Sequence, residues 1–262
     1  ENLDKIQKAD ILEAYNKIIN SSQKVMSVVG DFNRDKVLKT INDKFNYLEN
    51  QEVESKIDEV SLNEEKIIKI EKDDVAQAQI ILGYLCESYQ SEDYAPILVM
   101  NTLLGACGLS SRLFLELRDK KGLAYVVRSS YEVYSKSANI NVYIATHPNN
   151  IKTSIEGFLF EIARVKKTDI TEEELENAKS NILGKRNFYY ETNILESSMY
   201  SGFEINDLGF DYEEEFIEKI KNVKIQDIKK VADKYFNDKF VLTVLAQKEY
   251  LSQVDNINCK KY

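Results

Sequence analysis

One stretch of the chain, from Gly105 to Tyr134, constrains the fold more than any other. Its two glycines, Gly105 and Gly108, can take backbone angles that other residues avoid, and we expect a loop there. Apolar residues then recur with helical spacing up to Gly122, which follows two lysines. Cations in the last turn and a glycine after it are typical of a helix end. The stretch therefore predicts a loop, a short helix and a tight turn in succession.

The turn at Gly122 leads into a segment with a period of two, which is typical of a β-strand. The alternation predicts a strand face made of Tyr125, Val127, Ser129, Tyr131 and Val133, with Arg128 and Glu132 on the opposite face. Because the chain reverses at Gly122, Arg118 at the helix end should lie close to Tyr125 at the strand start. The residues alone leave two interpretations, a solvated arginine beside a packed tyrosine or a functional pair.

The motif SSRLFLELRDKKGLAY, residues 110–125, resembles the second half of the insulinase/pitrilysin family of zinc metallopeptidases, which includes mitochondrial processing peptidase. The resemblance implies that Arg118 and Tyr125 reach across a chamber to a peptide substrate bound at the zinc, and stabilise the transition state. The substrate-binding subunit of mitochondrial processing peptidase has a much longer glycine-rich insertion at this loop and lacks the Arg/Tyr pair. The match therefore favours the second half of an active peptidase, or the zinc-free member of a two-subunit peptidase.

The resemblance also implies an α+β fold, in which a β-sheet carries helices packed on one face. We expect residues 66–250 to form a complete domain of this kind without zinc, followed by a C-terminal tail, 251–262. Residues 49–65 are rich in carboxylates and lack hydrophobic periodicity, which predicts an acidic linker. Residues 1–48 are then the C-terminal fragment of a preceding, zinc-bearing peptidase domain.

A faint internal repeat supports this division. The segment from Asp10-Ile11 to VMSVVG resembles the segment from Asp227-Ile228 to VLTVLA. A repeat usually means that one supersecondary unit is used twice, so each segment is expected to end an αβ domain. Lys24–Gly30 should accordingly be a buried strand, and in this chain it would lack its sheet neighbours.

Other elements are predicted from periodicity and capping residues. Strands are expected at residues 67–70, 76–86, 138–144 and 240–246, where apolar residues alternate or cluster. Helices are expected to begin at Asp10, at Ser91, at Asn149 or Asn150, and at Thr171. The last of these has the Thr171-x-x-Glu174 pattern of a capping box.

The chemistry of a zinc peptidase is missing from this sequence. Zinc hydrolysis needs about three His or carboxylate ligands and a nearby base, and the family takes them from an H-x-x-E-H motif in its first domain. This chain has one histidine, His147, and no such motif. His147 precedes Pro148, which indicates an ordinary turn residue. We therefore expect no cofactor here, and zinc in the missing domain or a partner subunit.

Composition limits the cellular compartment and the classes of partner that we expect. A formal net charge of −9 argues against nucleic acid, and no run approaches the roughly 18–20 apolar residues of a membrane span. Three scattered cysteines indicate thiols in a reducing compartment, so we expect a cytoplasmic protein. The expected partners are a peptide substrate and a zinc-bearing domain or subunit. A homo-oligomer is a further way to cover the apolar surface of an incomplete domain.

Two functions remain open. The chain is either the C-terminal part of a zinc endopeptidase that processes or degrades peptides in an enclosed chamber, or a non-catalytic homologue that binds peptides or scaffolds a complex. An H-x-x-E-H motif in the full-length open reading frame would separate them.

The single histidine gives a first prediction. The chain by itself should bind no zinc stoichiometrically and should cleave no peptide, because it lacks a sufficient ligand set. Metal analysis of the purified chain tests this. One tightly bound zinc per chain that is lost on changing His147 would contradict it.

Overall fold

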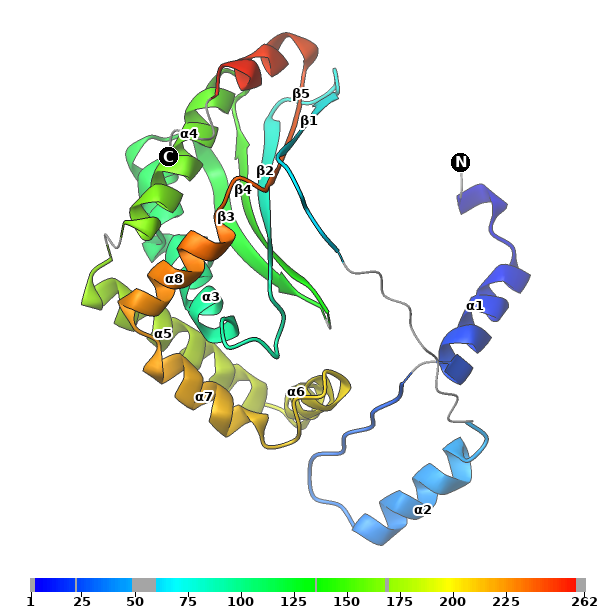
Figure 1. Ribbon diagram of the computed structural model, residues 1–262. Helices are drawn as coiled ribbons and strands as arrows, with labels where there is room; N and C mark the ends of the chain where they lie inside the picture. The colour runs from blue at the N-terminus through cyan, green and yellow to red at the C-terminus, as the bar shows by residue number, and fades with distance from the viewer. Residues whose placement is uncertain (1–2, 22, 49–59, 135, 168–169, 258–262) are drawn as a thin grey trace. The chain divides into compact units, whose positions relative to one another are not determined.

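The computed structural model describes residues 3–21, 23–48, 60–134, 136–167 and 170–257 (Figure 1). The chain divides into two compact units. The larger body comprises Glu59–Asn187 and Asp211–Tyr262, and the smaller unit comprises Glu1–Asp58 and Phe188–Phe210. Within the described ranges, no helix has the length and apolar character needed to cross a membrane.

The larger body is built on one five-stranded sheet. Its strands are β1 (Lys66–Glu71), β2 (Ala78–Cys86), β3 (Ala124–Val133), β4 (Ala138–Thr146) and β5 (Val241–Ala246). Their spatial order is β1-β5-β2-β4-β3, in which β1 and β5 run parallel and all other neighbours are antiparallel. The last strand thus lies between the first two.

Helices cover one face of this sheet (Figure 1). The helices α3 (Tyr94–Asn101), α4 (Ile151–Lys166) and α8 (Ile225–Tyr235) pack on the strands, and α5 (Glu172–Arg186) and α7 (Tyr212–Asn222) pack on α3. The core lies between these helices and alternate strand residues such as Ile80 and Ile140, which are fully buried together with Phe158 of α4. The predicted α+β fold with helices on one face is therefore confirmed. The helices cover only one face because alternation on β2 and β4 gathers the apolar side chains on that face.

The predicted helix starts are correct to within a few residues. Thr171 and Glu174 form the expected capping box at the start of α5. The helix expected from Ser91 begins at Tyr94, with Asp93 at its N-cap. Before α4, the His147 side chain caps a short 3₁₀ turn, η5 (Pro148–Asn150), by accepting a hydrogen bond from the Asn149 N–H.

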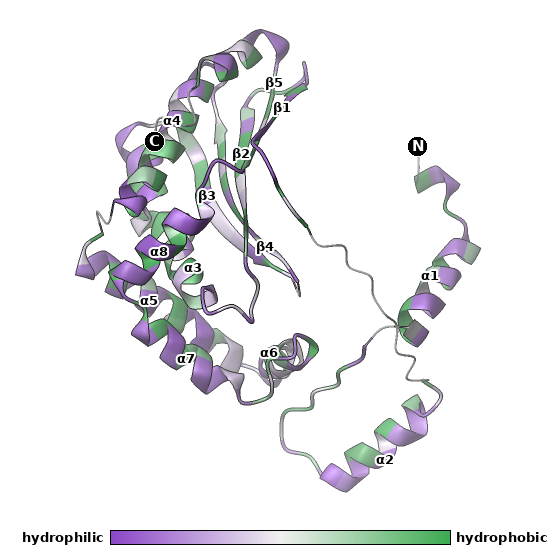
Figure 2. Ribbon diagram, viewed as in Figure 1, coloured by the Kyte–Doolittle hydropathy of each residue, from purple (hydrophilic) through white to green (hydrophobic). Residues whose placement is uncertain are grey.

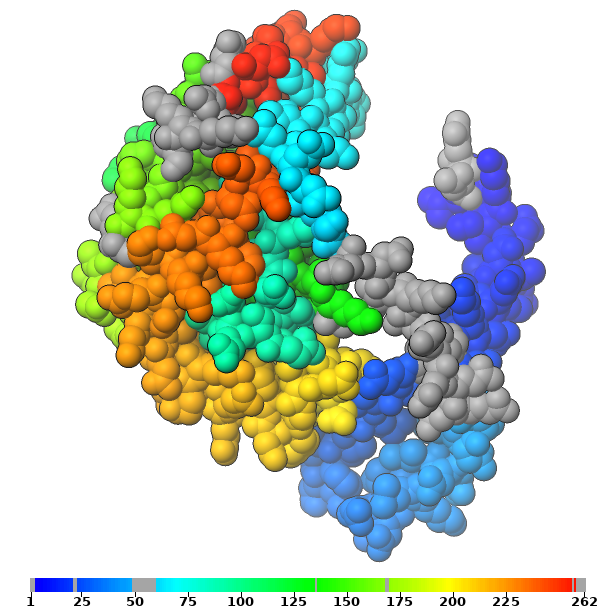
Figure 3. Space-filling model, in the orientation of Figure 1, coloured from blue at the N-terminus to red at the C-terminus, as the bar shows by residue number. Residues whose placement is uncertain are grey.

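The folded body continues past residue 250, where the domain was expected to end. The 3₁₀ segment η7 (Lys248–Asn256) buries Leu251 and Val254. It lies beside β1 (Figure 3). The Lys69 ammonium donates to Asp255 at 2.5 Å. Residues 258–262 of the expected tail lie outside the described residues, as do residues 49–59 of the expected acidic linker.

The smaller unit contains a 3₁₀ turn, η1 (Leu3–Lys5), and the helices α1 (Lys8–Ser21), α2 (Arg34–Phe45) and α6 (Asn193–Ile205). A 3₁₀ turn, η6 (Asn187–Tyr190), leads into its second segment. Asp10 does not begin α1 as predicted. It lies in the first turn, where its carboxylate accepts from the Gln7 N–H at 2.8 Å.

The predicted buried strand at Lys24–Gly30 is wrong for this chain. The segment joins no strand ladder among the described residues, and Met26 and Val28 are exposed. A strand needs a neighbour to bond its backbone groups, and this unit offers none in its described part. Hydrophobic positions, drawn in green, recur along α1 (Figure 2), and its Ile11 and Ile18 side chains are 61% and 62% exposed.

A buried ion pair joins two elements of the larger body. Arg112, which is 4% exposed, donates Nε and Nη2 to the two carboxylate oxygens of Glu174, at 2.8 and 2.9 Å. Burial tends to raise the pKa of Glu174, but the hydrogen bonds from Arg112 and Thr171 lower it below its ordinary value. Glu174 therefore serves both the α5 cap and the buried guanidinium.

We predict that Glu174→Ala destabilises the larger body by about 3 kcal/mol, because it removes both hydrogen bonds that Glu174 accepts from the buried Arg112 guanidinium and also removes the cap. Since its folded pKa is lowered, the contribution of Glu174 is present above the unfolded pKa of about 4.3 and is lost as the pH falls through the folded value. Urea titrations at neutral and acidic pH measure this. Glu173→Ala, at the neighbouring exposed position, is the control and should change stability by less than about 0.5 kcal/mol.

Candidate functional site

The corner predicted around Gly122 is formed as expected. The π-helical segment η4 (Phe114–Lys120) ends there, and Gly122 has a left-handed φ of 61°. The Gly122 N–H donates to the Arg118 carbonyl at 3.0 Å, and the Leu123 N–H donates to the Leu117 carbonyl at 2.9 Å. These bonds satisfy two carbonyls of the last turn and fix the direction in which β3 leaves.

The segment η4 is held against the core by Leu117, which is fully buried. Leu117 packs directly on Gly157 of α4, where an added Cβ would lie 2.2 Å from the Leu117 Cδ2. A helix held in this way has little freedom to roll, so the side chains on its outer surface keep their positions.

Arg118 and Tyr125 are brought together. Arg118 Nη1 donates to the Tyr125 carbonyl at 2.7 Å. Its guanidinium carbon also lies 4.7 Å from the ring centroids of both Tyr125 and Phe114, within the range of cation–π attraction. Phe114 was not predicted to belong to this site, although its i, i+4 spacing from Arg118 indicates that the two side chains share a helix surface.

Tyr125 does not lie on the strand face predicted for it. Val127 and Ser129 are 7% and 4% exposed, whereas Tyr125 is 77% exposed. A β-bulge between Ala124 and Val126 shifts the register against β4 and takes Tyr125 out of the alternation. The packed-tyrosine interpretation is therefore wrong, and the Tyr125 hydroxyl has no hydrogen-bond partner among the described residues.

The charges around the corner leave Arg118 as an unneutralised cation. Lys120 and Lys121 both pair with Glu116, each at 3.2 Å. Burial tends to raise the pKa of Glu116, but these two lysines lower it below its ordinary value, so the carboxylate is ionised at neutral pH. Arg118 has no carboxylate partner in the described part of the chain.

The two glycines before the site have different roles. Gly108 has a φ of 73°, as expected for a left-handed loop residue. Gly105 is not in a loop. It lies in the π-helical segment η2 (Thr102–Ala106), where an added Cβ would lie 2.3 Å from the Ser129 backbone nitrogen. The absence of a side chain at Gly105 allows η2 to approach β3 closely.

No zinc site fits the described residues. They contain no group of three or more His, Cys, Asp or Glu side chains placed to hold a metal ion. His147 instead uses its Nδ1 to accept from the Asn149 N–H at 3.2 Å, in the turn before α4.

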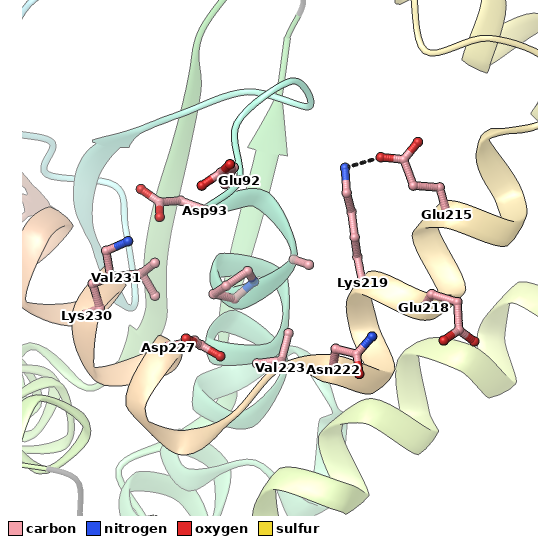
Figure 4. Close-up of a pocket in the computed structure, with 12 residues that line it drawn as sticks. Glu92, Asp93, Glu215, Glu218, Lys219, Asn222, Val223, Asp227, Lys230 and Val231 are labelled. Carbon is pink, nitrogen blue, oxygen red and sulfur yellow. Dashed lines mark ion pairs between the residues drawn. The ribbon is translucent and has the colours of Figure 1, made fainter.

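The larger body also has a cavity of about 440 Å³ between α3, α7 and α8, which includes neither Arg118 nor Tyr125 (Figure 4). Five of its twelve lining residues are carboxylates. Asp93 is hydrogen-bonded by Lys234 and Tyr235, both at 2.7 Å, and Glu215 pairs with Lys219 at 2.6 Å. Because other side chains of the body bind these carboxylates, Asp93 and Glu215 can be explained by structural roles without a ligand.

Comparison with known proteins identifies the family. Residues 5–182 match the family described as the peptidase M16 inactive domain. The chain belongs to this family. The resemblance seen in residues 110–125 is thereby confirmed.

Relatives of this M16 domain include proteins named as zinc proteases. The chain is 26% identical over 222 residues to "Uncharacterized zinc protease YmxG" of Bacillus subtilis, covering 85% of this chain and 53% of the relative. It is 27% identical over 246 residues to "Probable inactive metalloprotease YmfF" of the same organism, covering 89% of this chain and 54% of the relative. The chain thus spans about half the length of these curated relatives.

Solved structures agree on the fold. A protease from Helicobacter pylori superposes with a TM-score of 0.75 at 23% identity, covering 83% of this chain and 54% of that one. A protein of Pseudomonas fluorescens, described as a peptidase M16 inactive domain, also has a TM-score of 0.75, at 24% identity, with coverages of 84% and 53%.

The close approach at Gly105 gives a prediction. Gly105→Ala should destabilise the larger body by about 1–3 kcal/mol, because the new Cβ overlaps the backbone of β3 and forces η2 away. Thermal or urea unfolding measures the change. Gly184→Ala in α5, where nothing lies within 4 Å of the added Cβ, is the matched control and should stabilise by about 0.5–1 kcal/mol. Equal effects of the two substitutions would show that contact with β3 is not the reason for Gly105.

Proposed function

We propose that this chain is the zinc-free half of an M16 zinc endopeptidase that processes or degrades peptides in an enclosed chamber. The observation that supports this most is the exposed, rigid Arg118–Tyr125 corner. An exposed tyrosine whose ring and carbonyl are both held by one arginine presents its hydroxyl at a defined position. Such fixed donors are what transition-state stabilisation requires.

Each side chain of the corner has a distinct part in this proposal. The Tyr125 hydroxyl donates a hydrogen bond to the oxyanion that forms when water adds to the scissile carbonyl. The Arg118 guanidinium has five N–H groups, of which the Tyr125 carbonyl takes one. Its remaining donors bind a peptide carbonyl or carboxylate and so orient the substrate. A metal supplied from elsewhere would activate the water.

The zinc is proposed to come from a preceding domain or a partner subunit. Residues 1–48 are then the end of that zinc-bearing domain, joined through the linker 49–65. The exposed apolar side chains of α1 and the segment Lys24–Gly30, which pairs with no strand, support this, since neither is covered within the described part of the smaller unit. The relatives, which are about twice as long as the matched region, are consistent with it.

A second candidate is a non-catalytic homologue that binds peptides without cleaving them. It is favoured by the likeness to "Probable inactive metalloprotease YmfF". The same corner would then bind a peptide, but no metal would act with it.

The test is Tyr125→Phe in the longer protein that carries the zinc-binding half, or in this chain mixed with its zinc-bearing partner. Loss of one oxyanion donor should lower kcat by roughly 10²–10³-fold. The melting temperature should barely change, because the hydroxyl is exposed and bonds to no described residue. Arg118→Ala should in addition raise KM.

Tyr134→Phe is the matched control, since Tyr134 directly follows β3 and is 56% exposed. It should leave turnover unchanged. A Tyr125→Phe protein that melts several degrees earlier but keeps normal turnover would contradict the proposed role. Peptide binding without turnover in the wild-type long protein would favour the second candidate.

A further inference from the structure

The arginines of the larger body fall into two groups. Arg112, Arg164 and Arg186 are each paired with a carboxylate, of Glu174, Glu161 and Glu213 respectively. Arg118 and Arg128 have no carboxylate partner among the described residues, and both lie over a tyrosine ring instead. In a chain with a formal net charge of −9, two guanidinium groups without a carboxylate partner in the described ranges, one at the end of η4 and one on β3, are a distinctive local feature.

Arg128 lies on the face of the sheet that the helices leave open. Its side chain extends over the ring of its direct cross-strand partner, Tyr143, at 5.6 Å from the centroid. The Tyr143 hydroxyl donates in turn to Gln79 on β2, at 2.5 Å. The guanidinium therefore rests on a ring whose far end is fixed, and it projects from the sheet at a constant place.

The surroundings of Arg128 suit an extended peptide. Val126, its neighbour on the same face, is 38% exposed, and Ile81, the cross-strand partner of Tyr143, is 42% exposed. The half-exposed apolar side chains can pack against the methylene stem of an acidic residue, while the adjacent guanidinium binds its carboxylate.

Arg128 also has a defined spacing from the corner. Arg128 follows Tyr125 by three positions, with Val126 and Val127 between them, which corresponds to about 10 Å in a regular strand. An extended peptide has the same rise per residue. A peptide that runs along β3 with one residue at Arg118 and Tyr125 therefore brings a residue about three positions away to the level of Arg128.

We propose that Arg128 is a specificity-determining residue that binds an acidic side chain of the peptide substrate, about three residues from the position held by Arg118 and Tyr125. This inference rests on the proposed peptide-cleaving function and names the class of substrate. Tyr143 and Gln79 are positioning residues, because they act on the substrate only through Arg128.

The experiment uses the longer protein with its zinc-binding half. Its substrates are short fluorogenic peptides, otherwise uncharged, in which a single Glu is moved through the sequence and compared with Gln at each position. The wild type should prefer Glu over Gln at one position by about tenfold in kcat/KM, the effect of one charged hydrogen bond. Rising ionic strength should reduce this preference.

In Arg128→Gln the ratio of Glu to Gln peptides should fall to about one, while the Gln peptide is cleaved as before. Arg128→Glu should invert the preference in favour of Lys at the same position. Arg34→Gln is the matched control, since Arg34 is an exposed arginine of the smaller unit, and it should leave the ratio unchanged.

The outcomes separate this inference from the proposed function. If Tyr125→Phe loses turnover but Arg128→Gln keeps the Glu preference, only the role of Arg128 is overturned. If Tyr125→Phe keeps normal turnover, the proposed function fails. In that case the affinities of the Glu and Gln peptides, measured by fluorescence anisotropy, still test whether Arg128 discriminates acidic from neutral peptides. Equal affinities of the wild type for the two peptides would overturn the inference.

Discussion

The parallel pairing of β1 with β5 holds the larger body together. Six residue pairs, from Lys66 with Val241 to Glu71 with Ala246, join the beginning of this body to a strand almost at its end. Because β5 also pairs with β2, the last strand completes the sheet from within. The helices α3, α4, α5, α7 and α8 all lie between β2 and β5 in the sequence, so the pairing of β5 with β1 and β2 joins residues that are far apart in the chain.

The candidate site, in contrast, depends on local departures from regular structure. The π-helical turn of η4, the left-handed Gly122 and the bulge at the start of β3 follow one another within a short stretch. Each departure redirects a side chain. Together they bring the Arg118 guanidinium onto the Tyr125 carbonyl and turn the Tyr125 ring out to solvent. A regular helix followed by a regular strand would have buried that ring with Val127.

What the sequence could predict follows the same division. Some features were predictable because they depend only on local sequence. They are the alternation on β2 and β4, the capping box at Thr171 and the left-handed glycine at position 122. The proximity of Arg118 and Tyr125 was predictable for this reason, since it needs only a helix, a turn and a strand. The exposure of Tyr125 was not, because a bulge depends on the register against β4. The strand expected at Lys24–Gly30 failed for a related reason. A strand is a property of a pair, and a sequence pattern describes only one member of it.

The geometry of β1 and β5 has a mechanical consequence. Because the two strands are parallel neighbours, a force that pulls β1 by its beginning and β5 by its end loads all of their hydrogen bonds at once, in shear. Antiparallel neighbours pulled from adjacent ends would instead open one bond at a time. Forced unfolding is governed by the rate of crossing the unfolding barrier and not by equilibrium stability. The larger body should therefore resist extension by its two ends more strongly than its free energy of unfolding alone would indicate.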